Sequence, residues 1–464
     1  MKTSFREYLP YYKRNLKVAF PVMLTQLGAS LVGLFDTIMV GHYATADLAA
    51  VSFSNAIFFS VMVFSMGALM GLTPLIGVEV GAESAGRDTR QHANRVSYLY
   101  HSGISFTLLL SAAMLVILGS CIPLLGSFGQ EQVVVEAARP YYILIVISIV
   151  PFLFFCMQKQ FLEGLGNTMI AMVITISMNV LNIALNWVFI FGKFGCPAMG
   201  ATGAGIATLI SRTLMPVLFW MAIRAHKEWH KYIDRAQSQE SHHEGIRQLW
   251  KIGAPIGGQT VVETVLFTFS FIIIGWISKE ALAAHHIANQ IADLTFMLAL
   301  GIGSATTIRV SHQLGKGDLY AVRMAANASI HLVLVMNTIG AMLMISLRNY
   351  IPWIFTNDEA VIPIASSLIM IAGFFQYADG LQSVGAAMLR GLTDVKRPMV
   401  YAFIAYIVVS LPLGIFLTFT CHLGASGMWI SFIVSLSLAA ALFHTRFRKK
   451  LRDLEGKANL KQEK

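Results

Sequence analysis

Charged residues are scarce in this chain of 464 residues. Asp, Glu, Lys and Arg make up 12% of it, about half of the roughly 25% that is usual in soluble domains. Apolar residues make up 56%, and a dozen membrane-spanning helices of about 20 residues each would use only about half of the chain. The composition therefore excludes an ordinary soluble globule and indicates a protein that crosses the membrane many times.

Cysteine is also scarce, and the common signatures of catalysis are missing. The four cysteines show no Cys-x-x-Cys spacing, so neither a zinc site nor a disulfide framework is expected. The sequence lacks a GxxxxGK[ST] phosphate loop, an HExxH motif and a nucleophile elbow. We therefore expect no enzyme, no catalytic residues and no cofactor, with sodium as the only metal considered.

Twelve apolar runs are separated by polar loops, six on each side of a polar stretch at 224–251. Helices are required because a backbone amide in lipid needs a partner within its own segment. We expect an all-α integral membrane protein with twelve transmembrane helices in two six-helix bundles, and the polar stretch as a hinge-like connector. The runs lie at 18–40, 48–77, 96–118, 141–157, 169–191, 201–222, 252–277, 281–308, 325–347, 361–389, 399–423 and 425–442.

The basic residues predict which side of the membrane each loop faces. Of the 34 Lys and Arg residues, 29 fall in the two termini and in alternate loops, an excess that marks the cytoplasmic side. We expect a multi-pass protein of the cell (inner) membrane with both termini cytoplasmic. The net charge of +10 is spread between apolar runs, so no nucleic-acid partner is expected. Arg212, inside the sixth run, is expected to face protein or to snorkel.

The two halves of the chain are copies of each other. At an offset of 234 residues Asn55 matches Asn289, and the later run 200–203 matches 424–427. Because each copy has an even number of spans, the copies share one orientation and are related by a pseudo-twofold axis along the membrane normal, as in alternating-access carriers. The expected domains are an N-terminal six-helix bundle, 1–232, and a C-terminal six-helix bundle with connector and cytoplasmic tail, 233–464.

Three carboxylates lie inside apolar runs: Asp36, Glu263 and Asp379. Each costs about 2.5–3.5 kcal/mol at the centre of a spanning helix, and such residues mark functional sites by default. They must face a cavity, each other or a bound cation. Asp36 could instead be a solvated residue at a helix end, and the other two could make structural hydrogen bonds to neighbouring helices.

Amide side chains form a second set of polar candidates. Asn179, Asn182 and Asn186 project from one helix face, and with Asp36 they could form an oxygen-lined cation pocket. Such a stripe is more often interhelical packing. Asp293 lies beside Asn289 in the eighth run, where an interhelical hydrogen bond and a transport role are equally compatible with the sequence.

Several segments together resemble the multidrug and toxic compound extrusion (MATE) transporters, in particular the NorM-like branch. The resemblance covers nearly the whole chain. Its motifs are FDTIMVG at 35–41, LAAVS at 48–52, NIALNWVFIFG at 182–192, GATGAGIAT at 200–208, the glutamate Glu263, and MLRGLTDVKRP at 388–398.

The resemblance implies antiport of small hydrophobic, mostly cationic drugs or toxins against inward sodium or protons, in contact with membrane lipid, and we expect a monomer. Asp36, Asn182 and Asn186 fall on family positions of an N-lobe cation site, and Glu263 and Asp379 fall on C-lobe acidic positions. A further acidic position of some members corresponds to Asp358. At Asp293 an uncharged residue would be typical.

Three other functional classes remain as alternatives. The wider superfamily includes flippases of lipid-linked oligosaccharides, which would favour a basic cavity for a pyrophosphate lipid, whereas the intramembrane residues here are acidic. A membrane-embedded enzyme would need a catalytic constellation, and a passive channel would conduct without exchange.

Overall fold

A computed structural model describes residues 5–86, 88–233 and 242–462. In these ranges the chain is helical and contains no strand. Twelve helices of the described part are long and apolar enough to cross a membrane, which confirms the twelve predicted spans and a multi-pass membrane protein.

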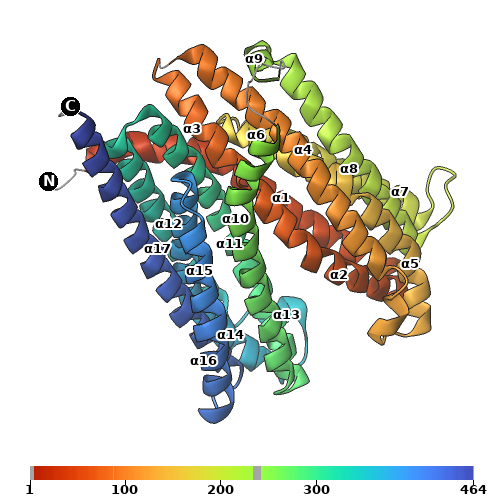
Figure 1. Ribbon diagram of the computed structural model, residues 1–464. Coiled ribbons are helices and arrows are strands. Elements are labelled where there is room, and N and C mark those ends of the chain that lie inside the picture. The colour runs from red at the N-terminus through yellow and green to blue at the C-terminus, as the bar shows by residue number, and fades with distance from the viewer. Residues whose placement is uncertain (1–4, 87, 234–241, 463–464) are drawn as a thin grey trace. The chain divides into compact units, whose positions relative to one another are not determined.

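The helices begin and end as follows (Figure 1): α1 (Phe5–Tyr43), α2 (Thr45–Leu69), α3 (Leu72–Ser84), α4 (Thr89–Cys121), η1 (Leu125–Phe128), α5 (Gln132–Ile147), α6 (Ile149–Gly164), α7 (Met169–Phe191), α8 (Gly200–Ala225), η2 (Lys227–Trp229), α9 (His230–Ile233), α10 (His242–Gly275), α11 (Lys279–Lys316), α12 (Leu319–Leu347), α13 (Ile351–Phe355), α14 (Val361–Gly391), α15 (Lys396–Phe403), η3 (Ile404–Ser410), α16 (Leu411–Ile415), η4 (Phe416–Thr420) and α17 (Ala425–Gln462).

The chain packs into two compact units. The N unit is Leu24–Gly257, and the C unit combines Met1–Met23 with Gly258–Lys464. The two packed units are divided inside α1 and inside α10. The predicted domain boundary at 232/233 describes the sequence repeat and stays a prediction. The described residues of the expected connector lie in the N unit on both sides of 234–241.

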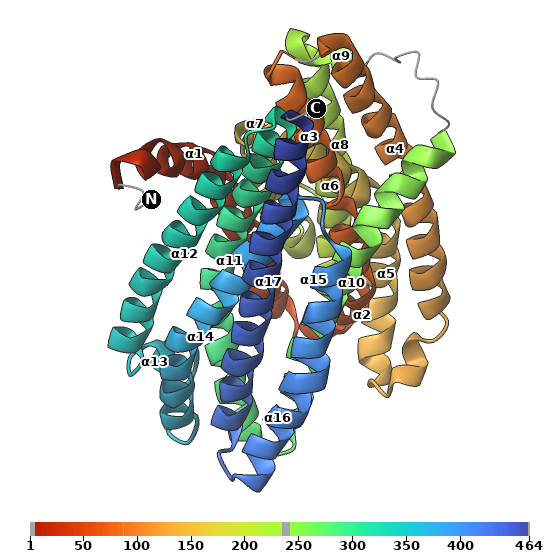
Figure 2. The same cartoon turned by 60° about the vertical axis from the view of Figure 1, so that its left-hand side comes forward.

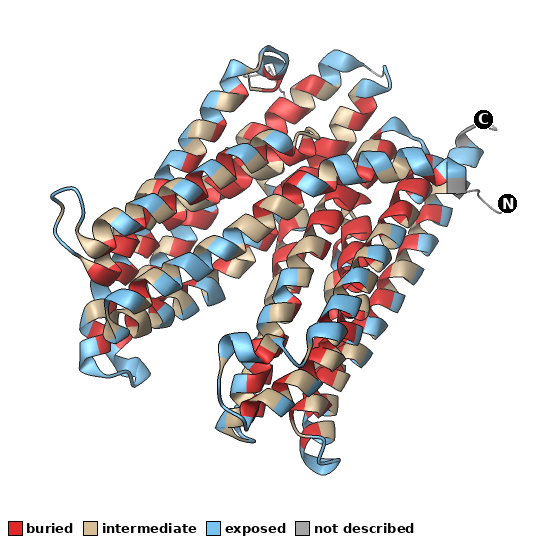
Figure 3. Ribbon diagram, turned by 180° about the vertical axis from the view of Figure 1, so that it is seen from behind, coloured by how far each residue is buried: buried red, intermediate tan, exposed pale blue. Residues whose placement is uncertain are grey.

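The helices of each unit have buried residues and exposed residues along their length (Figure 3), and many of the exposed residues are large and apolar. In the N unit α7 packs on α8, and α2 packs on α5. In the C unit α14 packs against α11, α12 and α17, which Figure 2 shows side by side. Exposed residues such as Val116 and Val335 are the surface that a lipid-facing helix requires, because lipid tails are as apolar as these side chains.

The sequence repeat reappears as matching hydrogen bonds in the two units. In the N unit the Thr73 hydroxyl donates to the Gln160 carbonyl oxygen at 3.0 Å. In the C unit the Thr307 hydroxyl donates to the Ala387 carbonyl oxygen at 3.1 Å. Thr73 and Thr307 are 234 residues apart, so equivalent positions of the two copies make the same interhelical contact.

Two of the predicted spans are each built from two helices. The span expected at 48–77 consists of α2 and α3, and the span expected at 141–157 belongs to α5 and α6. The first break lies at Gly71, where a Cβ atom would come within 3.0 Å of the Gly253 backbone nitrogen. The second break lies at Ser148, whose hydroxyl bonds to Ile145 O at 2.7 Å.

Helices α1 and α10 contribute to both units. The first part of α1 belongs to the C unit, where the buried Asn15 donates to Ala325 O and to Ser329 Oγ, both at 2.9 Å. The first part of α10 belongs to the N unit, where a Cβ atom at Gly253 would lie 2.3 Å from the Ala68 carbonyl oxygen. Small residues that let backbones approach this closely are typical of membrane helix crossings.

We expect Gly253→Ala to destabilise the protein by about 1–3 kcal/mol, because the new methyl group would overlap backbone atoms of α2. Gly119→Ala is the matched control, since nothing lies within 4 Å of a Cβ atom there. In this helix position alanine is favoured over glycine by about 0.5–1 kcal/mol. Thermal unfolding of the detergent-solubilised protein measures both changes, and equal midpoints for the two variants would contradict the close crossing.

Candidate functional site

The N unit contains a hydrogen-bonded carboxylate and amide site formed by α1 and α7, which we call the Asp36 site. The Nδ2 group of Asn186 donates to Asp36 Oδ1 at 2.5 Å and lies 3.4 Å from Asn182 Oδ1. Asn186 is fully buried, and its Oδ1 atom has no hydrogen-bond partner among the described residues. The structure therefore brings these three predicted residues together and leaves one buried amide oxygen available.

The third asparagine of the stripe is close to the same site. Asn179 is 9% exposed, faces α1 at Gly28, and its Nδ2 group lacks a hydrogen-bond partner in the described part of the chain. Carboxylate and amide oxygens are hard donors that suit sodium, and a carboxylate can equally take a proton. Within the described ranges no group of three or more His, Cys, Asp or Glu side chains could hold a metal ion.

Arg212 of α8 faces the interior of the N unit. Its guanidinium group donates to Ser148 Oγ at 2.8 Å and lies over the rings of Phe58 and Phe152, 5.1 and 4.7 Å from their centroids. It also interacts electrostatically with Asp36. Of the two placements expected from the sequence, the structure has Arg212 facing protein, where it places a cation near the carboxylate of the Asp36 site.

The C unit contains a second acidic site on α10 and α14, which we call the Glu263 site. Glu263 Oε1 accepts a hydrogen bond from Gln382 Nε2 at 2.8 Å. Asp379 is 4% exposed, and its Oδ1 atom has no hydrogen-bond partner among the described residues. Asp379 interacts electrostatically with Glu263 and with Asp293, so the three carboxylates belong to one region of the C unit.

Asp293 and Asn289 lie together on the exposed side of α11. The Asn289 amide donates to Asp293 Oδ2 at 3.1 Å, which is a contact between neighbouring turns of one helix. Asp293 thus has a local amide partner as well as its interaction with Asp379.

Asp358 lies apart from the Glu263 site. It is exposed in the loop before α14, where its Oδ1 atom accepts from the Ala360 amide at 2.9 Å. Asp379 lies eighteen residues after Val361, the first residue of α14, which is roughly 27 Å at 1.5 Å per residue. The structure therefore does not bring Asp358 to the other acidic residues of the C unit.

Sequence reasoning missed three polar neighbours of the Glu263 site: Gln382, Arg390 and Tyr406. Arg390 interacts electrostatically with Glu263, and the buried Tyr406 interacts with Glu263 and Asp379. Arg390 is easily taken for a cytoplasmic loop charge because it follows the tenth apolar run. Gln382 could have been predicted from the sequence, because it lies three residues after Asp379 and therefore on the same helix face.

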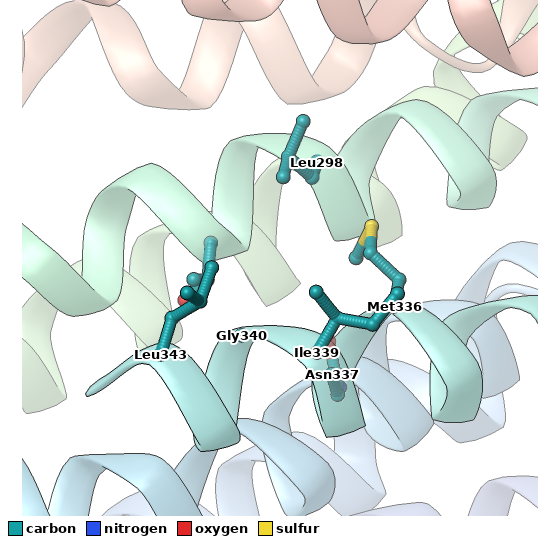
Figure 4. A pocket seen from close by; sticks show the side chains of 7 residues that line it. Leu298, Met336, Asn337, Ile339, Gly340 and Leu343 are labelled. Carbon is teal, nitrogen blue, oxygen red and sulfur yellow. The ribbon is translucent and has the colours of Figure 1, made fainter. Parts of the chain in front are cut away.

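Two cavities of the structure are distinct from these polar sites. One of about 180 Å³ lies in the C unit between α11 and α12, lined mainly by apolar side chains with Asn337 (Figure 4). The other, about 370 Å³, lies in the N unit between α7 and α8. Neither includes Asp36, Glu263 or Asp379, and the first is smaller than the roughly 300–1,000 Å³ of a usual ligand pocket.

The chain matches known proteins over nearly its whole length. A model of the MatE family matches residues 21–188 and 255–416, one segment in each copy of the repeat. The chain belongs to the MatE family. The resemblance seen in the sequence motifs is thereby confirmed.

Relatives of this MatE protein are named multidrug resistance protein NorM. The protein of Photobacterium profundum is 31% identical over 449 residues, covering 94% of this chain and 95% of the relative. The protein of Vibrio cholerae is 31% identical over 441 residues, covering 93% and 94%.

Solved structures of the same fold cover 96% of this MatE chain. An outward-facing multidrug resistance MATE family transporter of the MOP superfamily has a TM-score of 0.86 at 19% identity, with 97% of that chain covered. A MOP superfamily transporter of Pyrococcus furiosus, described as having a binding pocket of reverse polarity, has a TM-score of 0.83 at 20% identity and the same coverage.

In the Asp36 site we expect Asn186→Leu to destabilise the protein by about 1–3 kcal/mol, because Asp36 would lose its amide donor. Asn179→Leu is the matched control on the same helix face: it removes a buried amide that has an unpartnered Nδ2 group, so its stability change is expected to be small. Thermal unfolding at neutral pH compares them. A loss of stability as large for Asn179→Leu as for Asn186→Leu would contradict the hydrogen-bond assignment.

Proposed function

We propose that this protein is a secondary multidrug efflux antiporter that exports small hydrophobic, mostly cationic drugs or toxins in exchange for inward sodium or protons. The observation that carries the proposal is a partly or fully buried, hydrogen-bonded carboxylate site in each unit of a chain that matches NorM proteins over 93–94% of its length. Transport of this kind needs no covalent chemistry from the protein.

The mechanism follows from the cost of a bare charge. A buried carboxylate is stabilised by an inorganic cation, a proton or a cationic drug, so ion and drug compete for it. Each charge that moves down 100 mV releases about 2.3 kcal/mol. An ion shifts the equilibrium between two conformations only by as much as its affinity for the two conformations differs. Competition between ion and drug for one carboxylate supplies such a difference in affinity.

The proposal includes the cell (inner) membrane as location, both termini in the cytoplasm and a monomer as the working unit. The support for orientation is the distribution of Lys and Arg, of which 29 of 34 lie at the termini and in alternate loops. The seventeen-residue polar N-terminal segment and the basic end of α17 then lie on the same side.

Oligosaccharide-lipid flipping is the second candidate function, and the polarity of the sites argues against it. A pyrophosphate lipid carries negative charge, and Glu263, Asp379 and Asp36 would repel it. Arg390 and Arg212 are half-buried cations that interact electrostatically with Glu263 and Asp36, so each offsets one carboxylate rather than creating a basic cavity.

We expect ethidium to leave proteoliposomes that contain this protein when a sodium gradient or a pH gradient is imposed. Whichever gradient drives the efflux identifies the coupling ion, because only the exchanged ion can transfer its free energy to the drug. Ethidium fluorescence measures the efflux, with protein-free liposomes as control. The absence of efflux under both gradients would favour the flippase.

We expect Glu263→Gln combined with Asp379→Asn to lower gradient-driven ethidium efflux by at least about tenfold, a change of about 1.4 kcal/mol in the barrier. The double change removes the half-buried carboxylate of Glu263 and the buried carboxylate of Asp379 while keeping side-chain shape. Glu359→Gln is the matched control, because Glu359 is exposed in the loop before α14. Efflux equal to wild type in the double variant would refute the role of the Glu263 site.

A further inference from the structure

A guanidinium group in the C unit has no role in the sites described so far. Arg309 of α11 is half-buried, and its Nε and Nη2 atoms are buried without a hydrogen-bond partner among the described residues. A charged group that is taken out of water is costly unless it is paired and hydrogen-bonded. Arg309 therefore needs an acceptor that the described part of the chain does not supply.

The side chains that face Arg309 come from the first part of α1. Arg309 interacts electrostatically with Arg14, which is exposed, and with Tyr11, which is half-buried. Among the described residues the charged neighbour of Arg309 is thus a second cation. Two like charges repel each other unless an anion lies between them. We call Arg309, Arg14 and Tyr11 the Arg309 site.

The packing of α1 on α11 agrees with this placement. A Cβ atom at Gly301 would come within 2.4 Å of the Met23 side chain, so the two helices touch there. Arg14 lies nine residues before Met23, and Arg309 lies eight residues after Gly301, which is about 14 Å along one helix and about 12 Å along the other. The two arginines therefore lie at similar distances from the contact, on helices that pass each other in opposite directions.

Arg309 is the first of three basic residues on one face of α11. His312 and Lys316 follow at i+3 and i+7, and Lys316 is the last residue of the helix. On α1 an exposed lysine directly precedes Arg14, and another follows it three residues later. The Arg309 site is therefore surrounded by further positive charge, which favours the approach of an anion.

The equivalent positions of the N unit are apolar. The residues 234 positions before the three basic residues of α11 are Leu75, Val78 and Ala82. Leu75 is 9% exposed and belongs to the hydrophobic core of the N unit. The two copies keep the same interhelical hydrogen bond two residues earlier, at Thr73 and Thr307. The shared fold therefore does not require a cation at the position of Arg309.

Two acidic residues lie near this end of the C unit, and both have other partners. Asp318 interacts electrostatically with Tyr11, and its Oδ1 atom accepts from the backbone of the first turn of α12 at 2.8 Å. Glu7 Oε2 accepts from the Tyr320 hydroxyl at 3.4 Å. Neither acid is among the groups that interact electrostatically with Arg309. The anion that compensates Arg309 therefore has to come from outside the described chain.

The position of the Arg309 site favours the headgroup of a lipid as the source of this anion. Arg309 lies seven residues before the end of α11, about 10 Å at 1.5 Å per residue, at the end of the helix proposed above to be cytoplasmic. The same part of α1 exposes Leu16 and Phe20, at 43% and 59%, and exposed basic and apolar side chains on one helix are typical of the membrane interface. Basic pockets between helices on the cytoplasmic side bind anionic headgroups.

We propose that the Arg309 site binds the phosphate group of an anionic phospholipid of the cytoplasmic leaflet. A guanidinium group suits this ligand because it donates two parallel hydrogen bonds to a phosphate. The exposed Arg14 side chain turns to the phosphate and opens the guanidinium group of Arg309 to it. The phosphate then replaces a repulsion between two cations by two attractions and joins α1 to α11. The inference goes beyond the proposed function, and only the choice of leaflet rests on the proposed orientation.

The test measures binding of phosphatidylglycerol with a fluorescent acyl chain to the full-length protein in micelles of an uncharged detergent, with Kd obtained from fluorescence anisotropy. For Arg14→Gln and Arg309→Leu we expect Kd to rise at least about tenfold, because each change removes charge-assisted hydrogen bonds to the phosphate. Leucine is the residue that the N unit has at the position of Arg309. The matched control is Arg247→Gln, which removes one exposed charge from α10 and is expected to leave Kd unchanged.

Thermal unfolding gives a second measurement on the same variants. Without anionic lipid we expect Arg309→Leu to unfold at a temperature no lower than wild type, because the change removes a charge that has no partner. Added phosphatidylglycerol is expected to raise the unfolding midpoint of wild type and not that of Arg309→Leu, since a ligand stabilises only the protein that binds it. If Arg309→Leu does not fold, Arg14→Gln, which changes an exposed side chain, decides the test.

Competing ligands distinguish the sources of the phosphate group. We expect neither inorganic phosphate nor phosphatidylcholine to displace the labelled lipid at the concentration at which unlabelled phosphatidylglycerol does. Displacement by inorganic phosphate would assign the site to free phosphate and overturn the lipid, and equal displacement by phosphatidylcholine would overturn the requirement for an anionic headgroup. An unchanged Kd in folded Arg14→Gln and Arg309→Leu would overturn the site. An equal rise of Kd in Arg247→Gln would also overturn it, because the lipid would then respond to the total charge of the protein.

Discussion

The structure depends on one constraint: in an apolar surrounding, every polar group needs a partner supplied by the chain. The backbone meets this constraint by forming helices throughout the described residues. The side chains meet it through a small number of contacts, such as Asn15 on the backbone of α12 and Gln382 on Glu263. The sites of interest are the places where the constraint is met only in part, because a buried atom there still has no hydrogen-bond partner among the described residues.

Two helices are shared between the two units. α1 and α10 each contribute to both units, and each carries an acidic residue beyond the point at which it passes from one unit to the other, Asp36 in the N unit and Glu263 in the C unit. Each acidic site therefore includes a helix that is anchored in both units. The close approach of Gly253 to α2 shows how small side chains make such an anchor possible.

The two copies of the repeat have matching interhelical contacts but different charged residues. Thr73 and Thr307 make the same interhelical bond, whereas the N unit has Glu163 at the position where the C unit has Arg390. In the C unit a hydrogen-bonded network joins Ser270, His285 and Trp429. Every side-chain polar atom of this network is paired, which is the arrangement expected of a structural core. Duplication therefore preserved the packing contacts and left the buried charges free to differ.

The sequence by itself determined the class of the protein. Twelve apolar runs, the internal repeat and the intramembrane acids follow from composition and spacing, because each helix must bury its own backbone and each buried charge stands out against apolar neighbours. Only the tertiary structure decided which polar residues meet. Asp36 lies 150 residues from Asn186, and Asp358 lies apart from Asp379 although it is in the loop directly before the helix that carries Asp379. Periodicity describes one helix at a time, whereas a site is made by the packing of several helices.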